Sequence, residues 1–390
     1  MHWRLGASVS HSNEVESMLN VRYRTYADAL LEAGYATGYT GKGGWKNQFN
    51  KAPEGAGRVH NPAGEVSLPF DAFIENQPEG QPFCYWLGSG YAHRKFKPGS
   101  GVESGKKLEA VSVPPCWPDV AEIRSDILDY YVEVEEGDRD AGQAIEILEQ
   151  KGLIENTIVI IAGDHGWSFP MAKANLYDMG LRVPLVVRWG NRIQGPTVAR
   201  GRVIEDLVSL QDLAPTFLEA AGVDALPNMT AKSLMPLLQS SREGILDSSR
   251  KEIFAGLEVH VRFYPMRSIR TRDYLLIRNF LHTDSYGGGG VDNGPTKELI
   301  FANKENPLWR KYYQANFGSR PEYELYDVSA DPYQLTNLAG KTEYGNPFES
   351  LNKRLEAYLR ETGDPRISQK GPVRMLFADK RAASNGDRYP

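Results

Sequence analysis

The sequence has few cysteines, no long apolar run and no strong excess of either charge. Two cysteines occur among its 390 residues, Cys84 and Cys116, which excludes a disulfide-built scaffold. No run reaches the roughly 18 apolar residues of a membrane-spanning helix, and no export signal is visible at residues 1–17. The formal net charge of -5 gives no general attraction for nucleic acid. The sequence therefore predicts no nucleic-acid partner and no membrane span, and leaves the oligomeric state open.

The order of predicted elements indicates an α/β fold. A helix beginning at Thr25 and stopping at Gly34 is followed by a short strand and a glycine-rich loop. The stretch QPFCYWLGSGYAHRKF is predicted to be a buried strand that ends in a loop with His93. A helix over 123–151 and a strand over 158–161 continue the alternation. Such alternation is typical of a parallel sheet flanked by helices.

Three regions are predicted along the chain. Residues 1–262 form the large α/β domain, and 263–372 form a smaller α+β domain because short polar and apolar alternations with turn signals begin there. Within it, the stretch YGGGGVDNG from Tyr286 is predicted to be a flexible loop. Residues 373–390 are predicted to be a loosely ordered tail.

The stretch Thr157 to Val187 contains the strongest functional signal. Ile158 to Ile161 is apolar on both faces, which predicts a buried central strand of a parallel sheet. Asp164 and His165 follow it directly, and ligands of open α/β sheets bind beyond the carboxyl ends of strands. A carboxylate suits a hard divalent cation and an imidazole suits several metals, so these two residues are candidate metal ligands.

Three basic side chains lie just beyond predicted strand ends. Lys42, His93 and Lys173 are suited to holding an anion or moving a proton, and are therefore the candidate catalytic residues. Asn175 and Arg182 follow Lys173 and are candidate substrate contacts. The bland alternatives are a solvated surface lysine for Lys173 and an ordinary loop histidine, stacked on a neighbouring tyrosine, for His93.

The remaining histidines carry weaker signals. His260 ends a predicted strand and is either a substrate contact or a satisfied core histidine. Four others lie in polar surroundings without ligand spacing and are interpreted as surface residues: His2, His11, His60 and His282.

Taken together, these stretches resemble the sulfatase family of the alkaline-phosphatase superfamily. The resemblance is carried, in family order, by LLEAGYATGYTGKG, PFCYWLGSGYAHRKFKPGSG, IENTIVIIAGDHG, KANLYDMGLRVPLVVRW and YELYDVSADPYQLTNLA. These blocks cover residues 24–364, which makes the match far more specific than one motif. Within the family, YPMRSIRTRDYLLIRNF is most similar to heparan N-sulfatases, the sulfamidases acting on N-sulfoglucosamine.

The resemblance implies a fold, a reaction and a cofactor. The fold would be a large, mostly parallel sheet between helices, with an antiparallel sheet in the smaller carboxyl-terminal domain. The reaction would be hydrolysis of a sulfate ester or sulfamate on a sulfated saccharide, by a formylglycine beside Ca²⁺. Asp164 and His165 would bind the metal, Lys42 and Lys173 would hold sulfate oxygens, and His93 would bind sulfate or protonate the leaving group. Relatives of this kind would be periplasmic, secreted or lysosomal.

Two parts of the family pattern do not occur in the 390 residues. There is no Asp-Asp pair, and neither C-x-P-S-R nor S-x-P-S-R, the precursor of formylglycine, is present. We therefore expect an amino-terminally truncated sulfatase that is inactive as it stands. The alternatives are a non-catalytic, sulfate-binding remnant and a phosphodiesterase or phosphonate hydrolase of the same superfamily.

Overall fold

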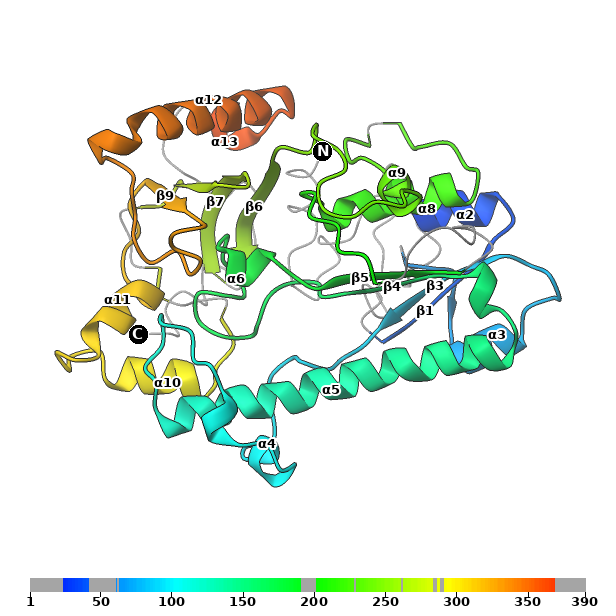
Figure 1. Ribbon diagram of the computed structural model, residues 1–390, viewed down its shortest axis with the longest axis horizontal. Helices are drawn as coiled ribbons and strands as arrows, with labels where there is room; N and C mark the ends of the chain where they lie inside the picture. The colour runs from blue at the N-terminus through cyan, green and yellow to red at the C-terminus, as the bar shows by residue number, and fades with distance from the viewer. Residues whose placement is uncertain are drawn as a thin grey trace, which may run out of the picture.

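The computed structural model describes residues 24–41, 61, 63–190, 201–227, 229–260, 262–282, 286–287 and 291–368. Lys42, His2, His11, His60 and the predicted tail lie outside the described residues. The described chain has the mixed α/β architecture that the sequence predicts, with helices packed around three sheets (Figure 1). In this part of the chain no helix is long and apolar enough to cross a bilayer.

The first sheet is parallel. Its strands β1 (Ala36–Gly41), β2 (Val66–Ser67) and β3 (Phe83–Gly88) lie in the order β2-β1-β3. Helix α2 (Tyr26–Glu32) precedes β1, and a reciprocal capping box between Thr25 and Asp28 starts it as predicted. Gly34 ends that helical segment in the left-handed region, with φ of 89°, where glycine carries no steric cost.

The second sheet corrects one prediction. Strand β4 (Ile158–Ala162) pairs antiparallel with β5 (Leu185–Trp189), and Ile161 is 37% exposed, so β4 is not a buried strand in a parallel ladder among the described residues. An apolar run shows that a strand forms but not in which direction its partner runs.

The long helix α5 (Ala121–Gln150) runs along one side of both sheets (Figure 1). It matches the predicted helix over 123–151. Ile123 and Ile127 on its inner face are fully buried and join a core that also contains Phe169 and Met266. This core contains residues from both halves of the chain. The loops that follow β3 and β4 therefore pack against the carboxyl-terminal part of the chain.

The third sheet is antiparallel, as the resemblance implies. Strands β6 (Ile253–His260), β7 (Arg262–Arg270), β8 (Tyr274–Asn279) and β9 (Tyr323–Asp327) follow one another in chain order. Because β6 belongs to this sheet, the sheet starts before residue 263, and the domain boundary at 262/263 stays a prediction. Helix α12 (Gly345–Glu361) covers the sheet through buried leucines on one face.

The remaining helices lie in the connections. They are α3 (Phe70–Glu75), α4 (Ser100–Glu103), α6 (Asp178–Leu181), α8 (Leu213–Ala220), α9 (Met235–Leu238), α10 (Pro295–Ala302), α11 (Arg310–Phe317) and α13 (Pro365–Ser368), with one-turn 3-10 helices at Leu108–Ala110, Ile154–Asn156, Leu210–Asp212 and Thr342–Tyr344.

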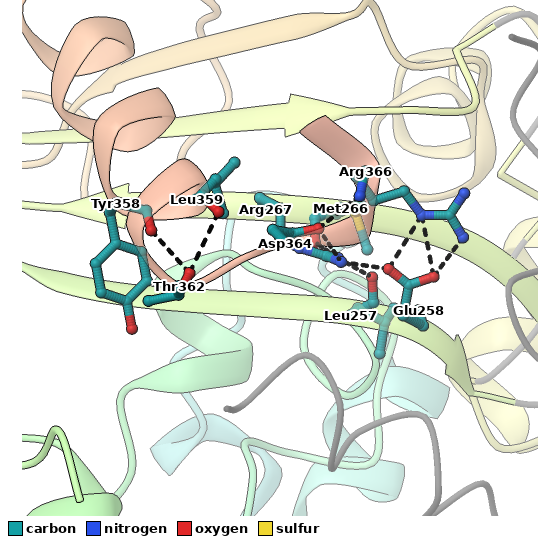
Figure 2. Close-up of polar contacts among 9 residues, drawn as sticks. All are labelled: Leu257, Glu258, Met266, Arg267, Tyr358, Leu359, Thr362, Asp364 and Arg366. Carbon is teal, nitrogen blue, oxygen red and sulfur yellow. Dashed lines mark hydrogen bonds and ion pairs between the residues drawn. The ribbon is translucent and has the colours of Figure 1, made fainter. Parts of the chain in front are cut away.

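A buried arginine fixes the carboxyl-terminal segment to the third sheet. Figure 2 shows Arg267 of β7 between Glu258 of β6 and Asp364, which precedes α13. The Arg267 Nε donates to Asp364 Oδ2 at 2.6 Å, and its Nη1 donates to two backbone carbonyls. Arg366 also donates to Glu258. The segment around α13 is therefore held against the strand that ends at His260.

Candidate functional site

Lys173 lies in the long loop between β4 and β5. Its backbone N–H donates to the Trp167 carbonyl at 3.0 Å, and the Asn175 amide donates to the Lys173 carbonyl at 2.9 Å. The lysine is only 3% exposed. The alternative of a solvated surface lysine is therefore wrong, and a buried ammonium group requires polar partners.

Those partners come from two distant segments. The Lys173 Nζ donates to Asp292 Oδ2 at 2.6 Å and lies 3.4 Å from His93 Nε2. His93 follows β3, and Asp292 precedes α10. The structure thus brings together two of the three predicted catalytic residues, and adds a carboxylate that the sequence did not reveal.

The hydrogen bonds of His93 indicate its tautomer. Its Nδ1 is 2.6 Å from the Arg94 carbonyl oxygen, an acceptor, so Nδ1 carries the proton. In the neutral ring, Nε2 then has the lone pair and accepts from the Lys173 ammonium. His93 is exposed, so it forms the solvent side of the site, with Lys173 beneath it.

Asp292 has an acidic carboxyl group because of its cationic neighbours. Burial raises its pKa, but the hydrogen bond and charge of Lys173, together with His93 and His260, lower it below its usual value. His260, at the end of β6, is half-buried and is one of the groups whose charge lowers this pKa. Its two interpretations, a substrate contact and a satisfied core histidine, both stay predictions.

A buried arginine beside His93 ties the three segments together. Arg94 makes two parallel hydrogen bonds to Asp126 of α5, at 2.7 and 2.8 Å, and donates to the Ser168 carbonyl at 2.9 Å. Asp126 also accepts from the backbone N–H and hydroxyl of Thr296, in the first turn of α10. Bidentate pairs of this kind fix geometry as well as charge. The network holds the loops after β3 and β4 against the segment before α10.

Lys297 steadies the segment that carries Asp292. Its Nζ donates to the Val291 carbonyl at 2.8 Å and to Asn293 Oδ1 at 3.0 Å, on either side of the carboxylate. Burial lowers the pKa of Lys297, and the charges of Asp292 and Glu298 oppose that shift.

The segment predicted to be a flexible loop also contains Tyr286, which is 1% exposed and donates to the Ala174 carbonyl at 3.0 Å. At Tyr286 and Val291, which are both buried, the flexible-loop prediction is therefore wrong.

Asp164 and His165 lie at the start of the same loop as Lys173. The His165 Nε2 is 3.7 Å from Asp164 Oδ1, and its Nδ1 is 2.7 Å from the Gly166 carbonyl oxygen, so in the neutral ring the lone pair is on Nε2. The Asp164 side chain is 56% exposed. The two donors are near enough to reach one cation.

These donors make only part of a calcium site. Ca²⁺ takes six to eight oxygen ligands, and Asp164 supplies one carboxylate. Among the described residues, no group of three or more acidic, histidine or cysteine side chains is placed to hold a metal. The described donor set by itself therefore does not fit calcium.

The other predicted contacts have different surroundings. The Asn175 amide is 3% exposed, donates to the Lys173 carbonyl and accepts from Arg320, so protein partners occupy it. Arg182 is exposed just after α6. His282 is exposed, as predicted for a surface histidine. Lys42 lies outside the described residues.

Asp292 is the functional candidate that sequence reasoning missed. It follows a run of glycines whose composition predicts only a loop. The sequence did contain one signal, the proline at the first position of α10, because proline there favours the start of a helix. A helix start indicates that the backbone just before it has a defined conformation.

Comparison with protein families gives two matches. A family model described as Sulfatase matches residues 7–223, more than half of the chain. A model described as N-sulphoglucosamine sulphohydrolase, C-terminal, matches residues 163–306.

Curated relatives are similar over most of this chain but over only part of their own length. An ulvan-active sulfatase of Formosa agariphila is 28% identical over 280 residues, which are 71% of this chain and 45% of that protein. The N-sulphoglucosamine sulphohydrolase of Homo sapiens is 27% identical over 326 residues, 74% of this chain and 58% of that protein. The chain thus spans about half the length of these relatives.

Solved structures share the fold. One, described as a complex with its substrate D-glucosamine-2-N,6-O-disulfate, has a TM-score of 0.63 at 19% identity and covers 95% of this chain and 90% of its own. A phosphonate monoester hydrolase of Agrobacterium radiobacter has a TM-score of 0.56 at 15% identity, covering 89% and 82%. At these identities the likeness concerns the fold alone.

Proposed function

The chain belongs to the sulfatase family, and from that premise we propose that its site binds the sulfate group of a sulfated saccharide as a sulfuric ester or sulfamate hydrolase does. The observation that supports this most is the buried Lys173 ammonium beside His93, in the same loop after β4 that contains Asp164. The match to the carboxyl-terminal model of N-sulphoglucosamine sulphohydrolase spans Lys173, His260 and Asp292. We therefore propose an N-sulfated glucosamine as the substrate class.

We propose the following roles for the residues. Lys173 and Lys42 bind sulfate oxygens, because an ammonium group offsets the charge that grows on a transferring sulfuryl group. His93 contacts the same group through Nε2 when that nitrogen carries a proton, because only an N–H donates to a sulfate oxygen. Arg182 and His260 contact the sugar. Asp164 and His165 would supply two ligands of a divalent cation, which would neutralise further charge, but the other ligands are not among the described side chains.

Turnover is a separate matter from binding. The 390 residues contain no C-x-P-S-R or S-x-P-S-R segment to supply formylglycine. We propose that this polypeptide alone binds the sulfated sugar without hydrolysing it. We propose that the family reaction takes place in the periplasm, in the lysosome or outside the cell.

Calorimetric titration of glucosamine N-sulfate into the chain tests the binding site. Lys173→Met should lower the affinity at least tenfold, the loss expected when a charge-assisted hydrogen bond is removed. Lys353→Met, an exposed change on α12, should leave the affinity unchanged. Equal affinity of the unmodified chain, Lys173→Met and Lys353→Met for glucosamine N-sulfate would refute the assignment of Lys173.

A parallel hydrolysis assay separates the reaction classes. Glucosamine N-sulfate, glucosamine 6-sulfate and a phosphodiester are incubated with the chain, and sulfate or alcohol release is measured. No release with retained binding is expected. Phosphodiester cleavage in preference to either sulfated sugar would favour the phosphodiesterase alternative.

A further inference from the structure

The carboxylate in the anion site is chemically unexpected, because it carries the same charge as the ligand. Asp292 takes one hydrogen bond of Lys173 at 2.6 Å, and its own side chain is 24% exposed. The lysine is 3% exposed. An anion approaching Lys173 from solvent therefore meets Asp292 and His93 first, and must share the ammonium with the carboxylate.

We propose that Asp292 makes this site selective for singly charged anions, sulfate esters and sulfamates, over doubly charged ones such as inorganic sulfate and phosphate monoesters. The proposal rests on the proposed function, because it concerns the anion bound by the same lysine. It goes beyond that function by assigning charge selectivity to a named side chain.

The charges beside Lys173 support this selectivity. The charges of Lys173 and Asp292 sum to zero. A ligand with one negative charge gains the ammonium contact against one unit of repulsion from Asp292. A second negative charge on the ligand doubles both the attraction to Lys173 and the repulsion from Asp292, so the pair removes the gain that a lone ammonium would give a doubly charged ligand. The larger desolvation cost of the doubly charged ligand then favours the singly charged one.

The position of Asp292 is held in place. Lys297 donates to the carbonyl and side-chain oxygens of the residues on either side of it. The start of α10 is bound to Asp126 through Thr296. Because the backbone is fixed on both sides, Asp292 cannot simply swing away to accept a second negative charge.

Methyl sulfate and inorganic sulfate are matched probes, since both present tetrahedral sulfate oxygens but carry one and two negative charges. We would measure both affinities by calorimetry in calcium-containing buffer at neutral pH. The wild-type chain should bind methyl sulfate more tightly than inorganic sulfate. In Asp292→Asn, methyl sulfate should gain about threefold and inorganic sulfate about tenfold, the effect of one unit charge a few ångströms away in a partly exposed site.

Two control variants isolate the charge at this position. Asp292→Glu keeps the charge and should keep the wild-type preference. Asp224→Asn makes the same charge change at an exposed residue after α8, far from α10 in Figure 1, and should change neither affinity. Thermal unfolding of each protein confirms that it is folded.

The outcomes separate the two proposals. Binding of both probes with the same ratio in wild type and Asp292→Asn would overturn the selectivity while leaving the anion site standing. Preference of the wild type for inorganic sulfate would overturn the selectivity even if Asp292→Asn did not fold. Binding of neither probe by the wild type would instead overturn the proposed function.

Discussion

Lys173 and Asp292 form an ion pair of 2.6 Å although they are 119 positions apart in the chain. The pair joins the loop after β4 to the segment before α10. A buried lysine stays charged only where an anion or strong acceptors compensate its lost hydration. Asp292 therefore keeps the ammonium in place before any ligand arrives.

Breaking this pair should cost stability. Lys173→Met removes the buried ammonium and leaves Asp292, which is 24% exposed, without that partner. Because solvent still reaches the carboxylate, we expect a loss of about 1–2 kcal/mol in the free energy of unfolding, less than for a fully buried pair. Denaturant unfolding measures it. Lys97→Met, which breaks a surface pair with Glu103, should have no measurable effect, and equal losses in both would contradict the account.

The pH dependence of stability should report Asp292. Burial raises its pKa, but Lys173 and the two histidines lower it below the ordinary value in the folded protein. A carboxyl group with a depressed folded pKa stabilises the fold above its unfolded pKa, and loses that contribution as pH falls through the folded pKa. The difference in unfolding free energy between wild type and Asp292→Asn should therefore shrink as the pH falls through and below the ordinary aspartate pKa of about 4. A difference that stays constant or grows over this range would refute the pairing.

Gly166 should tolerate no side chain. A Cβ there would lie 1.8 Å from the Met179 carbonyl oxygen, so the turn after His165 must shift. Gly166→Ala should destabilise the protein by about 1–3 kcal/mol, as overpacking does. The control is Gly142→Ala within α5, where nothing lies within 4 Å and alanine should stabilise the helix by about 0.5–1 kcal/mol. Loss of stability in both variants, measured by denaturant unfolding, would contradict the packing argument.

The arginine cluster of Figure 2 should be a major source of stability for the carboxyl-terminal segment. Arg267 is 0% exposed and bonds Glu258 and Asp364. Arg267→Met leaves two buried carboxylates without this cation, and we expect a loss of about 3–5 kcal/mol. Arg360→Met, in an exposed pair on α12, should change the unfolding free energy little. A small effect of Arg267→Met on thermal unfolding would show that the cluster is replaceable.

The sequence predicted local structure well where the signal is local. The capping box at Thr25 and the long amphipathic pattern of α5 each depend on neighbours within a turn or two, and both helices form as predicted. The direction in which β4 pairs was not predictable, because an apolar run indicates a strand and not the direction of its partner strand. The partner β5 lies beyond a long loop.

The candidate site was predicted in part. Position after a strand end was enough to single out His93 and Lys173, which the structure places 3.4 Å apart. Asp292 was missed because its role arises only when distant segments fold together. Asn175 was assigned to substrate, but the fold uses its amide to hold the loop backbone and to accept from Arg320. Sequence shows which polar groups are available, whereas tertiary structure decides which remain for a ligand.

A crystal structure of the chain with glucosamine N-sulfate bound would show which side chains hold the sulfamate group. We expect that group within hydrogen-bonding distance of Lys173 Nζ and His93 Nε2, with Asp292 still beside the lysine. A sulfamate bound elsewhere, with Lys173 and Asp292 paired as before and without ligand contact, would contradict this expectation.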